Sequence, residues 1–390
     1  MGFRSRSGKF VFLFLASFLA VSVAGAQVTV SKPVKLSIID AAGNLQLSKP
    51  VIEAFKAANP NLVASIEYLK LTSPEVVAKI RAQEMAGSLE NTMLIVGLDA
   101  IGSSIEDGVW EQIMPKYQSF FPNLEKNYLP GAKKAYDLMK GYGIVSVFCP
   151  GGPLLTYNPD KVTKPITTPA ELLAWAKANP GKFFYARPAN SGPGRSFLQG
   201  LPYILGDKDP KDPRTWDKTW AYLKELDQYI DYYPTGTAVT FKELAEGTRW
   251  MIASHIGWDM NQRILQIIPS TDKAFTFTGQ HWINDAHYLV MPAGLDKDRR
   301  NVTLALMAWM LKPENQAATY ATGYFYPGPA IKDVPLSMAS KEIQDQIRPA
   351  MRENLDEAVK TLPNEVQLDY KAMATAFDMW DQLVGSKIKK

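Results

Sequence analysis

The segment Ala189–Ser196 has the residue pattern with the clearest chemical use. It reads Ala-Asn-Ser-Gly-Pro-Gly-Arg-Ser, follows a predicted strand over residues 182–186 and opens a predicted helix. Backbone N–H groups at the start of a helix favour anions, and the guanidinium of Arg195 can grip a carboxylate or phosphate through two parallel hydrogen bonds. The alternative is a turn that only caps the helix. We expect four residues of this segment to contact a ligand: Ser191, Gly192, Gly194 and Arg195.

Acidic and amide side chains follow two other predicted strands. Asp40 and Asn44 come after the apolar segment 34–39, and Asp99 comes after residues 92–96. In open α/β sheets, ligands bind beyond the carboxyl ends of the strands. That rule makes Asp40, Asn44 and Asp99 candidate ligand contacts, with ordinary loop capping as the alternative.

Aromatic side chains stand near carboxylates in the second half of the chain. Trp258 follows an apolar predicted strand, Trp282 lies three residues before Asp285, and Tyr326 lies in a glycine-bounded loop. Aromatic faces near carboxylates bind cationic groups by cation–π contact, although ordinary packing of rings is the alternative. Asp40, Asp99 and Asp285 with the tryptophans favour a cation such as a polyamine or a thiamine-like compound, whereas Arg195 favours an anionic group. A zwitterion or a phosphoester could use both kinds of contact. The sequence leaves both classes open.

Two other kinds of site compete with a ligand pocket. His281, Asp285 and His287 have even spacing, so on a regular strand they share one face and form a possible zinc or iron site. A secreted hydrolase is the second alternative, because carboxylates are plentiful. The chain has no G-x-S-x-G, H-E-x-x-H or P-loop motif. Its single cysteine, Cys149, lies in an apolar segment, a poor place for a nucleophile. We expect no enzyme activity, no bound metal and no cofactor.

The elements that must position these residues alternate along the chain. Helical patterns with predicted N-caps at Ser48, Thr168 and Thr240 lie between apolar segments. Such alternation indicates βαβ units, and therefore an α/β fold of mostly parallel sheets flanked by helices. The predicted strands cover residues 34–39, 62–68, 92–96, 182–186, 250–256 and 286–291.

Two segments are predicted to cross between two lobes, namely 141–153 and 278–288. A hinged cleft between such lobes suits a ligand that is engulfed on closure. With both crossings, each lobe is discontinuous. We expect the first lobe to comprise residues 27–149 and 285–330, and the second to comprise residues 150–284 and 331–390.

Residues 1–26 have the pattern of a secretory signal peptide. Arg4, Arg6 and Lys9 precede an apolar segment over residues 10–24, and Ala24-Gly25-Ala26 is an A-x-A cleavage site. The apolar segment is shorter than the roughly 20 residues of a transmembrane helix. No cysteine near the cleavage site offers a lipid attachment point. We expect a soluble periplasmic protein after cleavage.

The charge balance excludes a nucleic-acid partner. Lysine and arginine number 43 and aspartate and glutamate number 39, and the predicted signal holds three of the bases, so the remainder has a net charge of 43 − 39 − 3 = +1. A near-neutral chain without a basic stripe lacks the electrostatic footprint that nucleic acids require.

Four segments of the chain carry a family resemblance. They are Thr92–Asp99 followed by Glu106–Trp110, Leu155–Val162, Phe241–Gly247 and Ala308–Gln316. In this order they resemble segments of the type II periplasmic solute-binding proteins of ABC transporters (extracellular solute-binding family 1), with the YnjB type as the most similar subgroup. That resemblance implies a two-lobed fold with a hinged cleft, a small-molecule solute, and as partners a membrane permease with a cytoplasmic ATPase. We expect a monomer.

Overall fold

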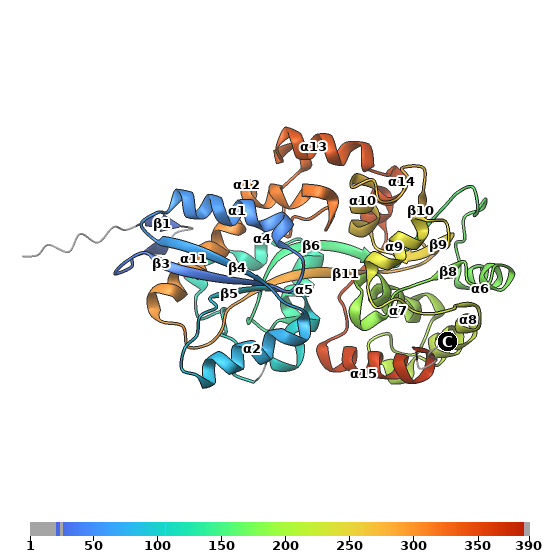
Figure 1. Ribbon diagram of the computed structural model, residues 1–390, viewed down its shortest axis with the longest axis horizontal. Helices are drawn as coiled ribbons and strands as arrows, with labels where there is room; N and C mark the ends of the chain where they lie inside the picture. The colour runs from blue at the N-terminus through green and yellow to red at the C-terminus, as the bar shows by residue number, and fades with distance from the viewer. Residues whose placement is uncertain (1–20, 24–25, 106, 386–390) are drawn as a thin grey trace, which may run out of the picture.

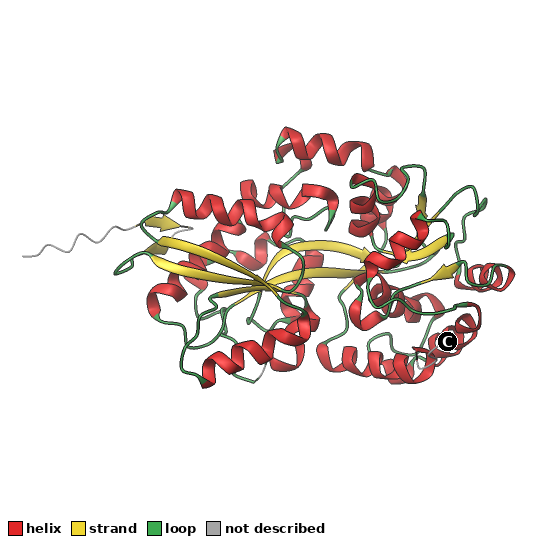
Figure 2. Cartoon of the chain, in the orientation of Figure 1, coloured by secondary structure: helices red, strands yellow, loops and turns green. Residues whose placement is uncertain are grey.

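The structure, a computed structural model, describes residues 21–23, 26–105 and 107–385. The predicted signal peptide therefore lies outside the described residues, apart from Val21–Val23 and Ala26. Figure 1 shows two lobes side by side, and Figure 2 shows that each is built from strands surrounded by helices. Within the described ranges, every helix is too short or too polar to span a bilayer.

The larger lobe contains a six-stranded sheet with the order β12-β11-β5-β3-β4, in which β6 also pairs with β11. Strand β3 is parallel to β4 and β5, whereas β11 is antiparallel to β5 and β6. Every residue of β5 is buried, as expected for a strand covered on both faces. The strands are β3 (Val34–Asp40), β4 (Val63–Lys70), β5 (Met93–Val96), β6 (Ile144–Gly152), β11 (Trp282–Val290) and β12 (Asn364–Glu365).

The smaller lobe contains a four-stranded sheet with the order β10-β7-β9-β8. Strand β9 is parallel to β8 and antiparallel to β7. The predicted two-lobed α/β architecture is thus present, but both sheets mix parallel and antiparallel pairs. The strands are β7 (Leu154–Tyr157), β8 (Phe183–Phe184), β9 (Met251–Ser254) and β10 (Lys273–Phe275); β1 (Val21–Val23) and β2 (Ala26–Val28) form a separate pair.

Helices pack around both sheets (Figure 2). Those before β6 are α1 (Leu45–Ala58), α2 (Ser73–Met85), α3 (Leu98–Ile101), α4 (Leu124–Asn127) and α5 (Pro130–Leu138). Those between β7 and β10 are α6 (Pro169–Ala178), α7 (Gly192–Leu205), α8 (Asp217–Leu226), α9 (Thr237–Ala245) and α10 (Ile256–Ile264). The last are α11 (Lys297–Met310), α12 (Pro313–Gln316), α13 (Lys341–Ile347), α14 (Glu353–Thr361) and α15 (Tyr370–Trp380).

Strands β6 and β11 run together from the larger sheet toward the smaller one (Figure 1). The predicted crossing 141–153 contains all of β6, and the predicted crossing 278–288 contains β11 as far as Tyr288. The chain passes between the lobes once more after α14. Strand β12 joins the larger sheet, and α15 then packs on the smaller lobe, where the indole N–H of Trp380 donates to the hydroxyl of Tyr185. The predicted lobe boundaries stay a prediction, and the described part of the C-terminal segment, residues 331–385, contacts both lobes.

One of the three predicted helix caps is confirmed. The hydroxyl of Thr168 accepts from the N–H of Glu171, whose carboxylate accepts from the N–H of Thr168. The caps predicted at Ser48 and Thr240 are wrong, because both hydroxyls lie inside helices and donate to carbonyl groups of the preceding turn. Helix α1 begins earlier because the carboxylate of Asp40 accepts hydrogen bonds from three backbone N–H groups of the loop and first turn.

Candidate ligand-binding site

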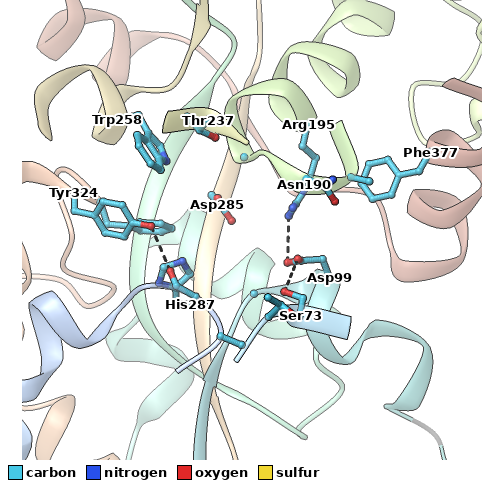
Figure 3. Close-up of a pocket in the computed structure, with 17 residues that line it drawn as sticks. Ser73, Asp99, Asn190, Arg195, Thr237, Trp258, Asp285, His287, Tyr324 and Phe377 are labelled. Carbon is cyan, nitrogen blue, oxygen red and sulfur yellow. Dashed lines mark hydrogen bonds and ion pairs between the residues drawn. The ribbon is translucent and has the colours of Figure 1, made fainter. Parts of the chain in front are cut away.

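A cavity of about 760 Å³ lies between the two lobes, at the carboxyl ends of β3, β5, β8 and β9 (Figure 3). This volume is in the range of small-molecule sites, roughly 300–1,000 Å³. Strand β11 forms the back wall, and its Asp285 lies in the middle of the pocket in Figure 3. The polar and aromatic residues that line it are Thr72, Ser73, Asp99, Asn190, Arg195, Thr237, Trp258, Asp285, His287, Tyr324, Phe325 and Phe377.

The start of α7 brings Arg195 to the pocket. The hydroxyl of Ser191 accepts from the N–H of Gly194 and bonds the hydroxyl of Thr237, which starts α9. A Cβ on Gly194 would lie 2.1 Å from the carbonyl oxygen of Ala186, so only glycine lets the helix start so close to the strand before it. The first turn of α7 is thereby fixed, and it holds Arg195 over the cavity.

Arg195 reaches across the cavity to the larger lobe. Its Nη1 atom lies 3.5 Å from Oδ1 of Asp99 in α3 and 3.5 Å from Oε1 of Gln367. The other oxygen of Asp99 accepts a hydrogen bond of 2.9 Å from the hydroxyl of Ser73, the first residue of α2. The guanidinium also lies 6.0 Å from the ring centre of Phe377. The two lobes are therefore linked by an ion pair at the pocket.

Asp285 is held by one of its two oxygens. Oδ1 accepts from Nε2 of Gln367 at 2.9 Å and from the N–H of Ala286 at 2.9 Å. Within the described chain, Oδ2 has no hydrogen-bond donor, and Nε2 of His255 is 3.8 Å away. Burial raises the pKa of the Asp285 carboxyl, although Arg195 and His287 pull the pKa down. The pocket thus contains a carboxylate with one free oxygen.

Two histidines behind Asp285 are neutral at pH 7. Burial lowers the pKa of His255 to about 3, and burial also lowers the pKa of His287. Nδ1 of His287 lies 3.0 Å from Nδ2 of Asn44. When Asn44 donates this bond, the proton of the His287 ring is on Nε2. Neither ring therefore compensates the charge of Asp285 as a cation.

An aromatic wall lies beside Asp285 (Figure 3). Trp258 stacks on Phe241 with ring centres 6.0 Å apart, and it meets Tyr324 edge-on at 5.7 Å. The hydroxyl of Tyr324 donates to the carbonyl of Ala42 at 3.3 Å, which fixes that ring against the loop after β3. The wall therefore offers two ring systems in fixed positions.

A model of the family described as bacterial extracellular solute-binding protein matches residues 51–350. This chain belongs to that family. The segment that aligns with Escherichia coli protein YnjB is 28% identical over 182 residues, covering 43% of this chain and 46% of YnjB. The alignment thus spans about half the length of that curated relative.

Solved structures of other solute-binding proteins share the fold. The spermidine/putrescine ABC transporter substrate-binding protein PotD of Streptococcus pneumoniae has a TM-score of 0.60 and 16% identity, covering 90% of this chain and 98% of PotD. The periplasmic binding protein AfuA of Actinobacillus pleuropneumoniae, with fructose-6-phosphate bound, has a TM-score of 0.62 and 13% identity, with coverage of 90% and 98%. These similarities confirm the two-lobed fold of a solute-binding protein.

The pocket brings together five of the predicted ligand residues of this solute-binding protein. Their contact with a solute stays a prediction. They are Asp99 of α3, Gly192 and Arg195 of α7, Trp258 of α10 and Asp285 of β11.

Four other predicted residues support the wall without lining it. Asp40 caps the loop that leads to α1, and Asn44 bonds His287 from behind. Ser191 and Gly194 fix the start of α7. The side chains of Asp40, Asn44 and Ser191 and the backbone N–H of Gly194 hold backbone or ring positions, so the capping alternative describes Asp40 well.

Two predicted aromatic residues lie elsewhere. The indole of Trp282 is buried and donates to the carbonyl of Ala358 at 2.9 Å. The hydroxyl of Tyr326 bonds the carboxylate of Asp356 at 3.1 Å. Both are packing residues away from the cavity.

The sequence argument missed several lining residues. Ser73 and Asn190 come after β4 and β8, where the rule about strand ends would have found them, whereas Thr237 starts α9 without a strand before it. His287 was considered only as a metal ligand. Phe377 and the bridging Gln367 come from a segment distant in sequence, and no local pattern indicates their place.

The zinc or iron site at His281, Asp285 and His287 is wrong. His281 lies before the first residue of β11, so it is not on the same strand as Asp285 and His287. The His281 ring stacks on Tyr203 at 4.7 Å instead. The described residues contain no group of three or more histidine, cysteine, aspartate or glutamate side chains suited to a metal ion.

Cys149 is fully buried behind the pocket, and burial raises the pKa of its thiol. Its Sγ atom lies 3.7 Å from Nδ1 of His255. A thiol in this protonated state is a poor nucleophile. The family and the solved relatives are solute-binding proteins.

Proposed function

We propose that this chain is the substrate-binding component of an ABC importer. It captures a small polar solute between its lobes and delivers the solute to a membrane permease that a cytoplasmic ATPase drives. It works in the periplasm, as a monomer. The observation that carries this proposal is a cavity of about 760 Å³ whose wall comes from both lobes, in a member of a solute-binding family.

Binding works through closure of the two lobes. The hinge comprises the segments 141–153 and 278–288, which contain all of β6 and most of β11. A solute that contacts Asp99 on one side and Trp258 on the other has contacts with both lobes only in the closed form. It therefore stabilises that form and shifts an equilibrium that exists without it. The permease recognises the closed form.

The similar structures support the role and leave the solute open. PotD is described as a spermidine/putrescine binding protein, and AfuA is described with a bound sugar phosphate. One fold thus serves solutes of opposite charge, so the solute must be argued from the side chains of the pocket.

A thermal-shift screen of residues 27–390 against small metabolites tests the proposal. A solute at about 100 times its Kd adds roughly 2.7 kcal/mol to the free energy of unfolding. We expect at least one compound to raise the Tm clearly and to be recovered unchanged. Recovery of a chemically converted compound would contradict the proposal in favour of an enzyme.

A further inference from the structure

The charges that line the pocket do not balance. Three charged side chains line it among the described residues: Asp99, Asp285 and Arg195. Arg195 pairs with Asp99 at 3.5 Å. His287 is neutral, because burial lowers its pKa. The pocket with both carboxylates ionised therefore has a net charge of −1, and the surplus charge is that of Asp285.

Gln367 keeps Arg195 from neutralising Asp285. Its amide stands between the two groups, with Nε2 donating to Oδ1 of Asp285 at 2.9 Å and Oε1 facing Nη1 of Arg195 at 3.5 Å. A second bond from Nε2 to the carbonyl of Asn284 fixes the direction of the amide. Oδ2 of Asp285 is left free, with a side chain that is only 17% exposed.

The places where an anion would bind already face carboxylates. Ser73 starts α2 and donates to Asp99, and Gly192 starts α7 beside Asp285, whose Oδ2 would lie 3.2 Å from a Cβ at that glycine. Both helices have proline as their second residue, Pro74 and Pro193, so each lacks one outward N–H donor there. The positive ends of both helices are thus directed at the protein's own acids.

We propose that the solute has a net positive charge and that its cationic group binds between Oδ2 of Asp285 and the rings of Trp258 and Tyr324. This inference rests on the proposed function. A desolvated cation gains from a carboxylate and from aromatic faces together. An anionic solute would meet two carboxylates, and its one cationic partner, Arg195, is already paired.

A defined mixture tests the charge of the solute on the wild-type protein. Residues 27–390 are equilibrated with equal amounts of eight compounds. Four have a net positive charge (putrescine, choline, thiamine and arginine), two are zwitterions (γ-aminobutyrate and glycine betaine), and two are anions (citrate and fructose 6-phosphate). Compounds retained with the protein after rapid filtration are then quantified by mass spectrometry. We expect enrichment of one or more of the first four, which carry net positive charge.

Preferred retention of a zwitterion or an anion would overturn the inference and leave the solute-binding role intact. Retention of none of the eight compounds would count against both. The wild-type measurement decides these outcomes without any variant.

Asp285→Asn then tests the position of the cation. It removes the charge and keeps the shape, so the Kd of the retained cation should rise at least about 10-fold, the effect of losing a hydrogen bond to a charged group. The matched control is Asp272→Asn, which removes a carboxyl with a raised pKa outside the pocket. We expect the Asp272→Asn protein to bind the retained cation with the same Kd as the wild-type protein. Equal affinity in Asp285→Asn would remove Asp285 from the site.

Discussion

The guanidinium of Arg195 and the carboxylate of Asp99 lie 3.5 Å apart and join the two lobes across the pocket. The side chain of Arg195 is 8% exposed, whereas that of Asp99 is 25% exposed and keeps a hydrogen bond from Ser73. The two partners therefore differ in what each loses when the other is removed.

We expect Asp99→Asn to destabilise the solute-free protein more than Arg195→Gln does. Loss of the Asp99 charge leaves a buried guanidinium under-paired, which costs about 1–3 kcal/mol. Loss of Arg195 leaves a partly solvated carboxylate, which costs about 0–1 kcal/mol. Urea unfolding of both variants measures the difference, and the reverse order would contradict it.

Trp258 and Trp282 should differ in what their removal affects: solute binding for Trp258 and stability for Trp282. Trp282→Ala should lower the free energy of unfolding by about 3–5 kcal/mol, the usual cost of emptying a buried aromatic site. Trp258 is half-buried at the cavity, so Trp258→Ala should cost less stability and weaken solute binding more. Calorimetric Kd and Tm values for both variants check this. A Trp258→Ala protein with wild-type affinity would place Trp258 outside the site.

Asp272 should make the stability depend on pH between about 4 and 6. Burial and the nearby carboxylates Asp259 and Asp160 raise its pKa to about 6, while Arg352 lowers the pKa. The unfolded chain has an ordinary carboxyl pKa near 4. The folded state therefore holds the proton at a pH where the unfolded state has lost it, so the free energy of unfolding falls as pH rises through this window.

We expect this fall to be of order 1 kcal/mol, after a discount for solvent screening. It should be absent in Asp272→Asn. Urea unfolding at pH 4, 5, 6 and 7 measures both proteins, and parallel pH profiles would show that another group is responsible.

Gln367→Leu should remove the hydrogen bonds that hold Asp285 and Arg195 in position. The substitution keeps the volume and removes the amide that bridges Arg195 and Asp285, so we expect a loss of about 1–3 kcal/mol in stability for the buried partners left unpaired. The Kd of a cationic solute should also rise, because the hydrogen bond from Gln367 no longer fixes the orientation of the Asp285 carboxylate and of its Oδ2. Gln367→Glu is the informative companion. Its added charge should raise the pKa of Asp285 further, which shifts the pH at which binding is lost to a higher value.

Local sequence patterns predicted where the strands lie better than whether neighbouring strands run parallel or antiparallel. The predicted strands at 34–39 and 92–96 correspond to β3 and β5. The rule that ligands bind beyond the carboxyl ends of strands selected Asp99, which does line the pocket. The direction of β11 was not visible, because whether a strand runs parallel or antiparallel depends on where the chain returns. His281 precedes the first residue of β11 and stacks on Tyr203, against an argument that placed it on one regular strand with Asp285 and His287.

Side-chain competition explains the failures at helix starts. Ser48 and Thr240 have types and spacing typical of N-caps, yet Asp40 caps the first helix from outside it, and α9 begins three residues before Thr240. Gln367 and Phe377 were not predictable at all. They reach Asp285 and Arg195 across long separations in sequence, and only the tertiary structure brings such residues together.

The order of these segments along the chain also bears on biosynthesis. A growing polypeptide contains the strands of the smaller sheet and most of the larger one before residues 364–380 have been added. Until then it lacks the amide of Gln367 and the ring of Phe377. The lining of the pocket is therefore complete only after this last passage of the chain between the lobes.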